Sequence, residues 1–142
     1  MVFFYNFYFT VLSLNNTKVY YGVITDSYLE NYSYGTVFKQ TDVQVQISIK
    51  GYEGYFRIKS EFADNIREID RVVSQSRWAK IWLYEGKTYN GQNIIYQVET
   101  DKGIVLPQNN VRSYYTVLCS ITFVGLLVPL LLIFGLYYEW IR

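Results

Sequence analysis

SYYTVLCSITFVGLLVPLLLIFGLYY, residues 113–138, contains no charged residue, and its centre, residues 117–136, is almost wholly apolar. About 20 helical residues, each rising about 1.5 Å, match a hydrocarbon core of about 30 Å. A chain of 142 residues is too short to surround such a helix with a soluble core. The stretch therefore predicts one transmembrane helix, which with a short tail takes up residues 113–142. Aromatic residues flank it, as is typical of side chains at membrane interfaces: Tyr114 and Tyr115 before it, and Tyr137, Tyr138 and Trp140 after it.

Small residues within this helix suggest a packing face. Thr116 and Ser120 are four residues apart, and Gly125 leaves room for close approach by another helix. The alternative is that this face contacts lipid only. Pro129 removes one backbone donor and favours a kink. Because no charged residue lies at bilayer depth, this helix alone does not suggest an ion pathway.

Residues 1–16 form a second apolar segment, and the first charged residue of the chain is Lys18. The segment is too short to span a bilayer as a helix and lacks the basic start of a signal peptide. Three alternatives remain: an interfacial or buried segment packed on the membrane helix, a strand of the following domain, or part of a first membrane helix.

Residues 17–107 are predicted to form a small β-rich domain, because residues 41–50 alternate strictly in polarity. Apolar side chains there predict a core face, and polar ones predict a face wetted by solvent. Gly51 to Gly54 then predict a turn into a second arm with Phe56 and Ile58 on the core face. The full predicted core is Val43, Val45, Ile47, Ile49, Phe56, Ile58, Phe62, Ile66, Ile69, Ile81 and Leu83.

The remaining elements follow from shorter patterns. We expect strands at residues 19–26, 77–84, 93–100 and 104–106, loops at 27–40 and 85–92, and a linker at 108–112. Ser60 is the expected cap of a helix over residues 60–74. The predicted fold class is a membrane-anchored α+β protein: a small antiparallel β barrel or sheet in the OB-like order βββαββ, followed by one C-terminal transmembrane helix. An SH3-like barrel and a plain antiparallel sheet with one covering helix are the alternatives.

Three short motifs carry a resemblance: Tyr21-Gly22-Val23-Ile24, Tyr55-Phe56-Arg57-Ile58 and Ala79-Lys80-Ile81-Trp82. On these motifs the chain resembles uncharacterised bacterial families of small membrane proteins that join a compact β domain to one or two membrane helices. The resemblance implies an architecture and a membrane location, and it supplies no catalytic residue.

The residue types argue against catalysis. The chain has no histidine, and its single cysteine, Cys119, lies in the predicted membrane helix. Asp64, Glu68 and Asp70 are interleaved with arginines, which predicts a salt-bridged helix face rather than a cation site. We therefore expect no catalytic, cofactor-binding or metal-ligating residues. A formal net charge of +1 also argues against nucleic acid as a partner.

Two sets of side chains are candidates for binding. Trp78, Trp82 and Tyr84 on one strand face, with Tyr52 and Tyr55 on the hairpin, are candidate contacts to a protein partner or a second copy of the chain. Lys50, Arg57 and Lys59 are candidates for anionic lipid headgroups or another anionic ligand. The sequence thus predicts a non-enzymatic single-pass membrane protein that acts as an accessory, regulatory or immunity-type subunit. The alternative is an OB-like domain that binds an anionic ligand at the membrane surface.

Flanking charges give an orientation. Lys102 and Arg112 precede the membrane helix and only Arg142 follows it, while short basic flanks favour the cytoplasmic side. Together with the resemblance, this predicts a bacterial inner-membrane protein whose domain faces the cytoplasm.

Overall fold

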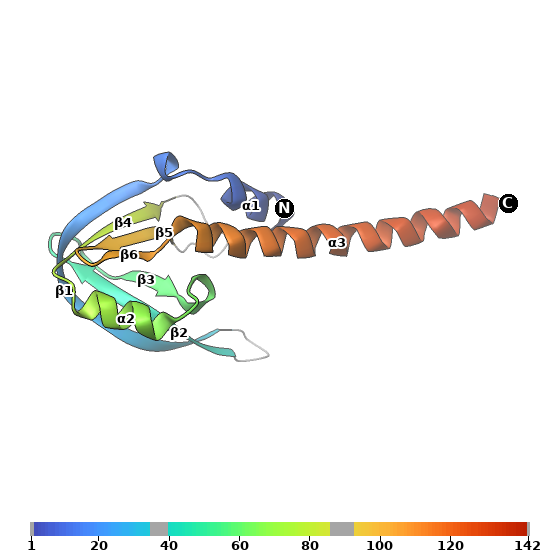
Figure 1. Cartoon of the computed structure of the whole chain (residues 1–142). Coiled ribbons are helices and arrows are strands. Elements are labelled where there is room, and N and C mark those ends of the chain that lie inside the picture. Colours follow the sequence, from blue (N-terminus) through green and yellow to red (C-terminus); the bar gives the residue numbers. More distant parts are fainter. Residues whose placement is uncertain (1, 35–39, 86–92, 142) are drawn as a thin grey trace. The chain divides into compact units, whose positions relative to one another are not determined.

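A computed structural model describes residues 2–34, 40–85 and 93–141, and the chain divides into two compact units. One unit comprises Met1–Leu12 and Arg112–Arg142, and the other comprises Ser13–Val111. The second unit, called the β domain below, is an α+β fold (Figure 1). Its elements are η1 (Leu14–Asn16), β1 (Lys18–Tyr34), β2 (Gln40–Ile49), β3 (Phe56–Lys59), η2 (Ser60–Phe62), α2 (Ile66–Ser74), β4 (Trp78–Tyr84), β5 (Ile94–Thr100) and β6 (Gly103–Leu106).

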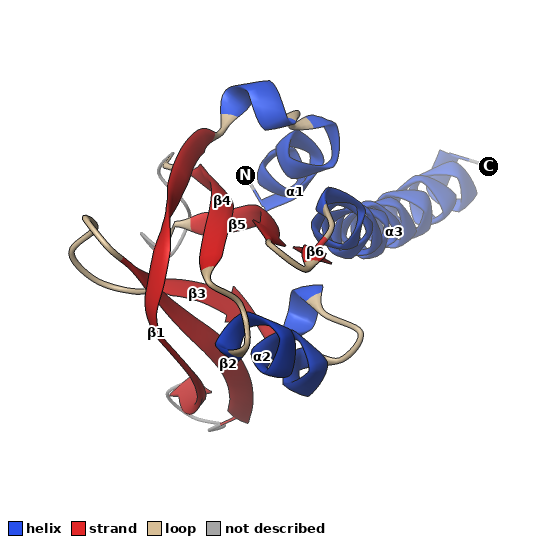
Figure 2. Cartoon of the chain, turned by 60° about the vertical axis from the view of Figure 1, so that its left-hand side comes forward, coloured by secondary structure: helices blue, strands red, loops and turns tan. Residues whose placement is uncertain are grey.

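Strand β1 organises the sheet of the β domain. The six strands lie in the order β3-β2-β1-β4-β5-β6, and every neighbouring pair is antiparallel (Figure 2). The first part of β1, Lys18 to Val23, pairs with β4, and the part from Ile24 to Tyr34 pairs with β2. A register shift between Ile24 and Asp26 separates the two parts. Such an irregularity bends a strand, and here it lets one strand belong to both halves of the sheet.

The predicted core is largely confirmed. Val45, Ile47, Ile49, Phe56, Ile58, Phe62, Ile69, Ile81 and Leu83 are buried, whereas Val43 and Ile66 are only partly so. The hairpin register places Val45 opposite Ile58 and Ile47 opposite Phe56, so the alternation of both arms converges on one face. Gly51 and Gly54 between them have φ angles of 88° and 110°, which side chains with a Cβ rarely adopt.

The predicted helix start was wrong. Ser60 opens the short η2 turn, and its hydroxyl donates to the Asp42 carboxylate rather than capping a helix. The helix α2 begins at Ile66, and the Asn65 side chain accepts a hydrogen bond from the Glu68 backbone N–H at 3.3 Å. An extended Asn with its side chain on the third helical residue is a normal N-cap, so Asn65 takes the role assigned to Ser60.

The predicted loop at residues 27–40 was also wrong throughout its described part. Residues 27–34 continue β1, and Leu29 pairs with Val45 in the register with β2. Ser27 and Asn31, which pair with Ile47 and Val43 of β2, are polar, so the segment lacks the hydrophobic period that marks a strand. Residues 35–39, and residues 86–92 of the second predicted loop, lie outside the described residues.

The first unit contains the helix α1 (Val2–Val11) and, from Arg112 on, the helix α3 (Gln108–Ile141). Because residues Val2–Val11 are helical, the strand alternative for the N-terminal segment is wrong. The ring of Phe9 stacks on Tyr115 with centroids 4.7 Å apart, and the Arg112 guanidinium donates to the Leu12 carbonyl at 2.7 Å. These two contacts join the end of α1 to the early turns of α3.

Helix α3 is longer than predicted, because residues 108–112 form its first turns instead of a linker. Pro107 lies directly before it, and the Asn110 N–H donates to the Pro107 carbonyl at 3.1 Å. Proline is well tolerated at a helix start, where its missing N–H would have no intrahelical partner. The span Gln108–Phe134 is long and apolar enough to cross a membrane, and its most apolar stretch of 18 residues has a mean hydropathy of 2.7.

Candidate functional site

A pocket of about 240 Å³ lies between β3 and β5, and we call it the β3–β5 pocket. Four residues singled out in the sequence meet there, namely Tyr52, Tyr55, Arg57 and Lys59. The other lining residues are Phe56, Leu83, Asn93 and Ile95. The strand alternation of β3 places Arg57 and Lys59 opposite the core-facing Phe56 and Ile58, so both cations face away from the core.

Aromatic rings form one wall of the β3–β5 pocket. Tyr52 stacks on Phe56 with centroids 4.3 Å apart, and Tyr20 meets both rings, at 5.1 and 5.2 Å. The Tyr20 hydroxyl donates to the Glu85 carboxylate, which also pairs with Lys18 at 3.2 Å. The hydrogen bond from Tyr20 lowers the pKa of Glu85 and, in turn, raises the pKa of Tyr20. Glu85 is thus already engaged by a cation and a hydroxyl.

The sequence predicts that the polar face of β2 is wetted by solvent, but two glutamines on this face are buried. Gln44 and Gln46 are only 6% and 3% exposed, and both side-chain amides donate to the Glu30 carboxylate on β1. The Tyr28 hydroxyl donates to the side-chain Oε1 of Gln46 at 3.2 Å. The sequence alternation identified the two faces correctly, but it does not reveal that β1 and β3 flank the glutamines on both sides. We call Tyr28, Glu30, Gln44 and Gln46 the polar ladder.

The outer face of β1 and β4 differs from the expected aromatic contact surface. Trp82 is only 9% exposed and its ring lies under the Lys80 ammonium, 4.7 Å from ring centroid to nitrogen. Trp82 therefore offers little exposed surface, and its role as a partner contact stays a prediction. Neighbouring strands β1 and β5 lie on both sides of it, where it pairs with Val19 and Gln97. Trp78 and Tyr84, at the two ends of β4, are partly exposed.

Exposed apolar side chains occur instead on β1, which sequence reasoning missed. Val19, Tyr21 and Val23 are 44%, 65% and 56% exposed and, being two residues apart, share one face of the strand. Tyr21 contacts Trp78, with ring centroids 5.4 Å apart. The period of two was visible in the sequence, but Tyr20 and Ile24 on the other face are apolar as well, so the pattern did not identify the outward side.

A wide, open groove of about 730 Å³ crosses this surface, and we call it the β1 groove. Its lining includes Tyr21, Val23 and Trp78 together with two cations, Lys50 and Arg77. The candidate cations thus separate into two places, since Lys50 lines the β1 groove and Arg57 and Lys59 line the β3–β5 pocket. Arg77 was not identified from the sequence, in which it only begins a predicted strand.

The acidic residues near α2 differ in their surroundings. Glu68 pairs with Arg71, while Asp64 is exposed and lies before the helix. Asp70 differs, because its Oδ1 is buried with no hydrogen-bond partner among the described residues. Burial raises the pKa of Asp70. In the described ranges, no group of three or more acidic, cysteine or histidine residues is placed to hold a metal ion.

The side chains of the candidate residues on α3 are described for the first part of the helix only. Tyr114 is partly exposed, and Tyr115 is buried. Thr116 and Ser120 are exposed, and their hydroxyls donate to the carbonyls of Arg112 and Thr116 at 2.8 and 2.9 Å. A Cβ added at Gly125 would meet no described atom within 4 Å. Tyr137, Tyr138 and Trp140 belong to α3, but their side chains lie outside the described part.

Comparison of the chain with protein-family models, with curated proteins and with solved structures gave no match.

Proposed function

We propose that the chain is a non-enzymatic, single-pass membrane protein whose β domain binds a partner protein, as an accessory, regulatory or immunity-type subunit of a membrane complex. The observation that carries this proposal is the exposed surface of Val19, Tyr21 and Val23 beside Trp78. Clustered exposed apolar side chains on a small domain are typical of contact sites, and Tyr and Trp are enriched at protein interfaces. The contact surface therefore centres on β1 rather than on Trp82.

The order of strands supports an OB-like description of the domain. Strand β1 pairs with both β2 and β4, α2 lies between β3 and β4 in the chain, and β4 and β5 form an antiparallel pair. An OB fold has these connections and uses outer strand surfaces and loops for binding. Strand β6 is an addition to that pattern, and β3 and β5 are not hydrogen-bonded neighbours in the sheet.

The decisive experiment is affinity purification of the full chain from native membranes in mild detergent. We expect a stoichiometric partner, or a second copy of the chain, whose recovery falls at least tenfold in Tyr21→Ser/Val23→Ser. Lys102→Gln, which changes an exposed residue of the β5–β6 turn, is the control and should retain the partner. Absence of any stoichiometric partner in the wild type would refute the proposal.

The orientation is proposed from charge alone, with the β domain in the cytoplasm of a bacterial cell. Single cysteines at Ser27 and at Arg142, in a Cys119→Ala background, test it with a membrane-impermeant thiol reagent. We expect labelling from outside intact cells only at position 142. Labelling of position 27 instead would reverse the orientation.

A second candidate function is the binding of an anionic ligand or lipid headgroup in the β3–β5 pocket. The specific observation that favours it is that Arg57 and Lys59 line the pocket together with the rings of Tyr52 and Tyr55. Binding of glycerol phosphate to the full chain in neutral detergent tests it by calorimetry. Affinity should fall with ionic strength and in Arg57→Ala, and Lys50→Ala should retain it. No heat of binding at millimolar ligand would exclude this candidate.

A further inference from the structure

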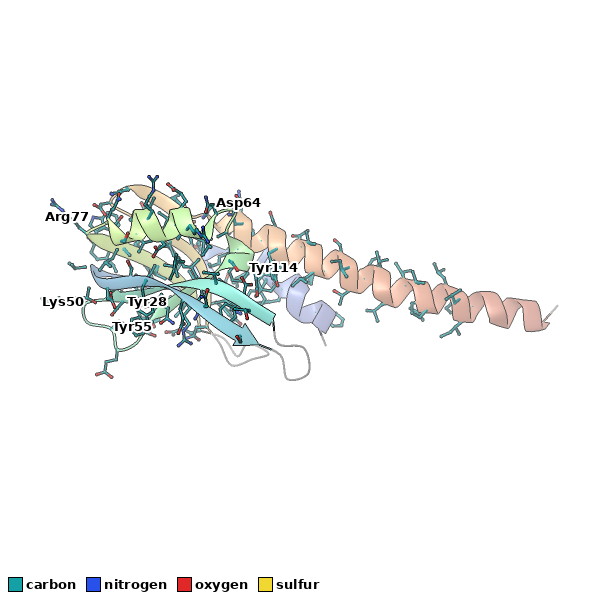
Figure 3. The ribbon with its side chains drawn as sticks, turned by 90° about the horizontal axis from the view of Figure 1, so that it is seen from below. Tyr28, Lys50, Tyr55, Asp64, Arg77 and Tyr114 are labelled. Atoms are coloured by element: carbon teal, nitrogen blue, oxygen red, sulfur yellow. The ribbon has the colours of Figure 1, made fainter. Side chains whose placement is uncertain are left out.

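Two cations lie beside apolar side chains in the β1 groove, and backbone hydrogen bonds hold both of them next to β1. The Lys50 N–H donates to the Val23 carbonyl at 2.8 Å, and the Ile24 N–H donates to the Arg77 carbonyl at 3.0 Å. The strands β2 and β4 lie on opposite sides of β1, so Lys50 and Arg77 bond from opposite sides to two consecutive residues of β1, Val23 and Ile24. Figure 3 shows both side chains extending from the same end of the β domain. Tyr21, Val23 and Trp78 supply the apolar surface.

The charges of these two cations are not neutralised within the described part of the chain. Neither Lys50 nor Arg77 forms an ion pair there, and no residue that lines the groove is acidic. Asp101 does contact Arg77, but through the backbone, because its Oδ1 accepts the backbone N–H of Arg77 at 2.9 Å. Burial alone would raise the pKa of Asp101, but backbone donors from Arg77, Asp101 and Trp78 outweigh it, so this pKa is lowered. Asp101 thus stays charged and fixes the Arg77 backbone.

The shape of the groove favours a protein segment over a small molecule. Small ligands usually bind in concave sites that enclose most of their surface, whereas this groove is wide and open. An open surface on which two cations lie beside apolar side chains therefore fits a segment of a protein partner.

We propose that the β1 groove binds an acidic segment of a partner protein, in which an aromatic or aliphatic side chain lies between carboxylates. This inference rests on the proposed function and names the chemistry of the partner. The central side chain packs on Tyr21, Val23 and Trp78, and the carboxylates on either side meet Lys50 and Arg77. Exposed charge pairs contribute modestly to affinity, while a buried aromatic contact contributes more.

A defined peptide tests the inference. The probe is a fluorescein-labelled peptide with one phenylalanine between two pairs of glutamates, titrated by fluorescence anisotropy against the full chain in phosphatidylcholine nanodiscs. Its affinity should fall about tenfold in Lys50→Gln/Arg77→Gln and at least tenfold in Tyr21→Ser. The matched control is Arg57→Gln/Lys59→Gln, which removes the same charge from the β3–β5 pocket and should leave the affinity unchanged. Raising the salt concentration should weaken binding to the wild type and have little effect on the groove variant.

Several results would overturn the inference. The same peptide with lysines in place of glutamates must bind at least tenfold more weakly, and equal binding would exclude an acidic partner. Contact of the groove with lipid would instead assign the surface to the bilayer. It would appear as a shift of tryptophan emission on phosphatidylglycerol nanodiscs that Lys50→Gln/Arg77→Gln abolishes. If the partner captured from native membranes depends on Tyr21 but not on Lys50 and Arg77, the proposed function stands and this inference fails.

Discussion

The polar ladder gives the sharpest test of how the sheet is stabilised. The Glu30 carboxylate accepts from the amides of Gln44 and Gln46, both of which are buried. Replacement of Glu30 by alanine removes the acceptor of both amides at once. A buried donor without a partner costs about 1–3 kcal/mol, because its lost hydration is no longer compensated.

The expected loss can be worked from the surroundings of Glu30. Glu30 itself is only partly buried, so its truncation admits water to the two amides and places the cost of each at the lower end of that range. We therefore expect Glu30→Ala to lower the free energy of unfolding by about 2 kcal/mol, and Glu30→Gln, which keeps one acceptor oxygen, by about 1 kcal/mol.

The measurement is urea unfolding of the full chain in mild detergent, followed by tryptophan fluorescence from Trp78 and Trp82. Glu53→Ala is the matched control, because it removes an exposed carboxylate in the β2–β3 turn and should change stability by less than about 0.5 kcal/mol. A Glu30→Ala protein as stable as this control would refute the reasoning that the ladder holds β1 to β2.

Three further predictions concern other parts of the chain. Asp70→Asn should stabilise the protein at neutral pH by up to about 1 kcal/mol, because it removes the charge of a carboxylate whose Oδ1 is buried with no described partner. Burial raises the folded-state pKa of Asp70, so the wild-type fold loses stability as pH rises and Asp70 ionises, and the advantage of Asp70→Asn should disappear in acid. An advantage in thermal midpoint that is the same at neutral and acidic pH, or an equal gain from Asp64→Asn, would contradict this. Gly22→Val should destabilise the fold by about 2 kcal/mol in urea unfolding, since an added Cβ would lie 3.1 Å from the Lys50 carbonyl oxygen, and unchanged stability would show that the strand can shift. Phe9→Ala removes the ring that stacks on Tyr115 and should speed amide hydrogen exchange in α1, whereas exchange as slow as in the wild type or the Val11→Ala control would contradict this contact.

The sequence predicted the parts of the fold where hydrophobic periodicity is strong. Residues 41–58 carry a strict alternation and a glycine turn, and their hairpin and core face are confirmed. The span of α3 was predicted because a long apolar run has few alternatives. By contrast, residues 27–34 are held as a strand by their pairing with β2, and the polar residues opposite Ile47 and Val43 hide that pairing from a single sequence.

The candidate binding surfaces were harder to predict, because exposure depends on neighbouring strands. Trp82 and Tyr21 are both aromatic residues on outward faces, yet Trp82 is covered by Lys80 and Tyr21 is the more exposed. The convergence of Tyr52, Tyr55, Arg57 and Lys59 followed from the hairpin and was predictable. The meeting of Lys50 and Arg77 depends on two long-range backbone hydrogen bonds to β1, which no local pattern indicates.

The double role of β1 has a consequence for how the domain acquires its structure. Its pairing with β2 joins segments that are near in sequence, whereas its pairing with β4 joins Lys18 to Leu83. Closing the longer loop loses more chain entropy, so the contacts between β1 and β4 should form after the β1–β2–β3 meander. Since Lys50 and Arg77 reach β1 from these two sides, the β1 groove is complete only when the late step is complete. The groove would then be a surface that incompletely folded chains do not present.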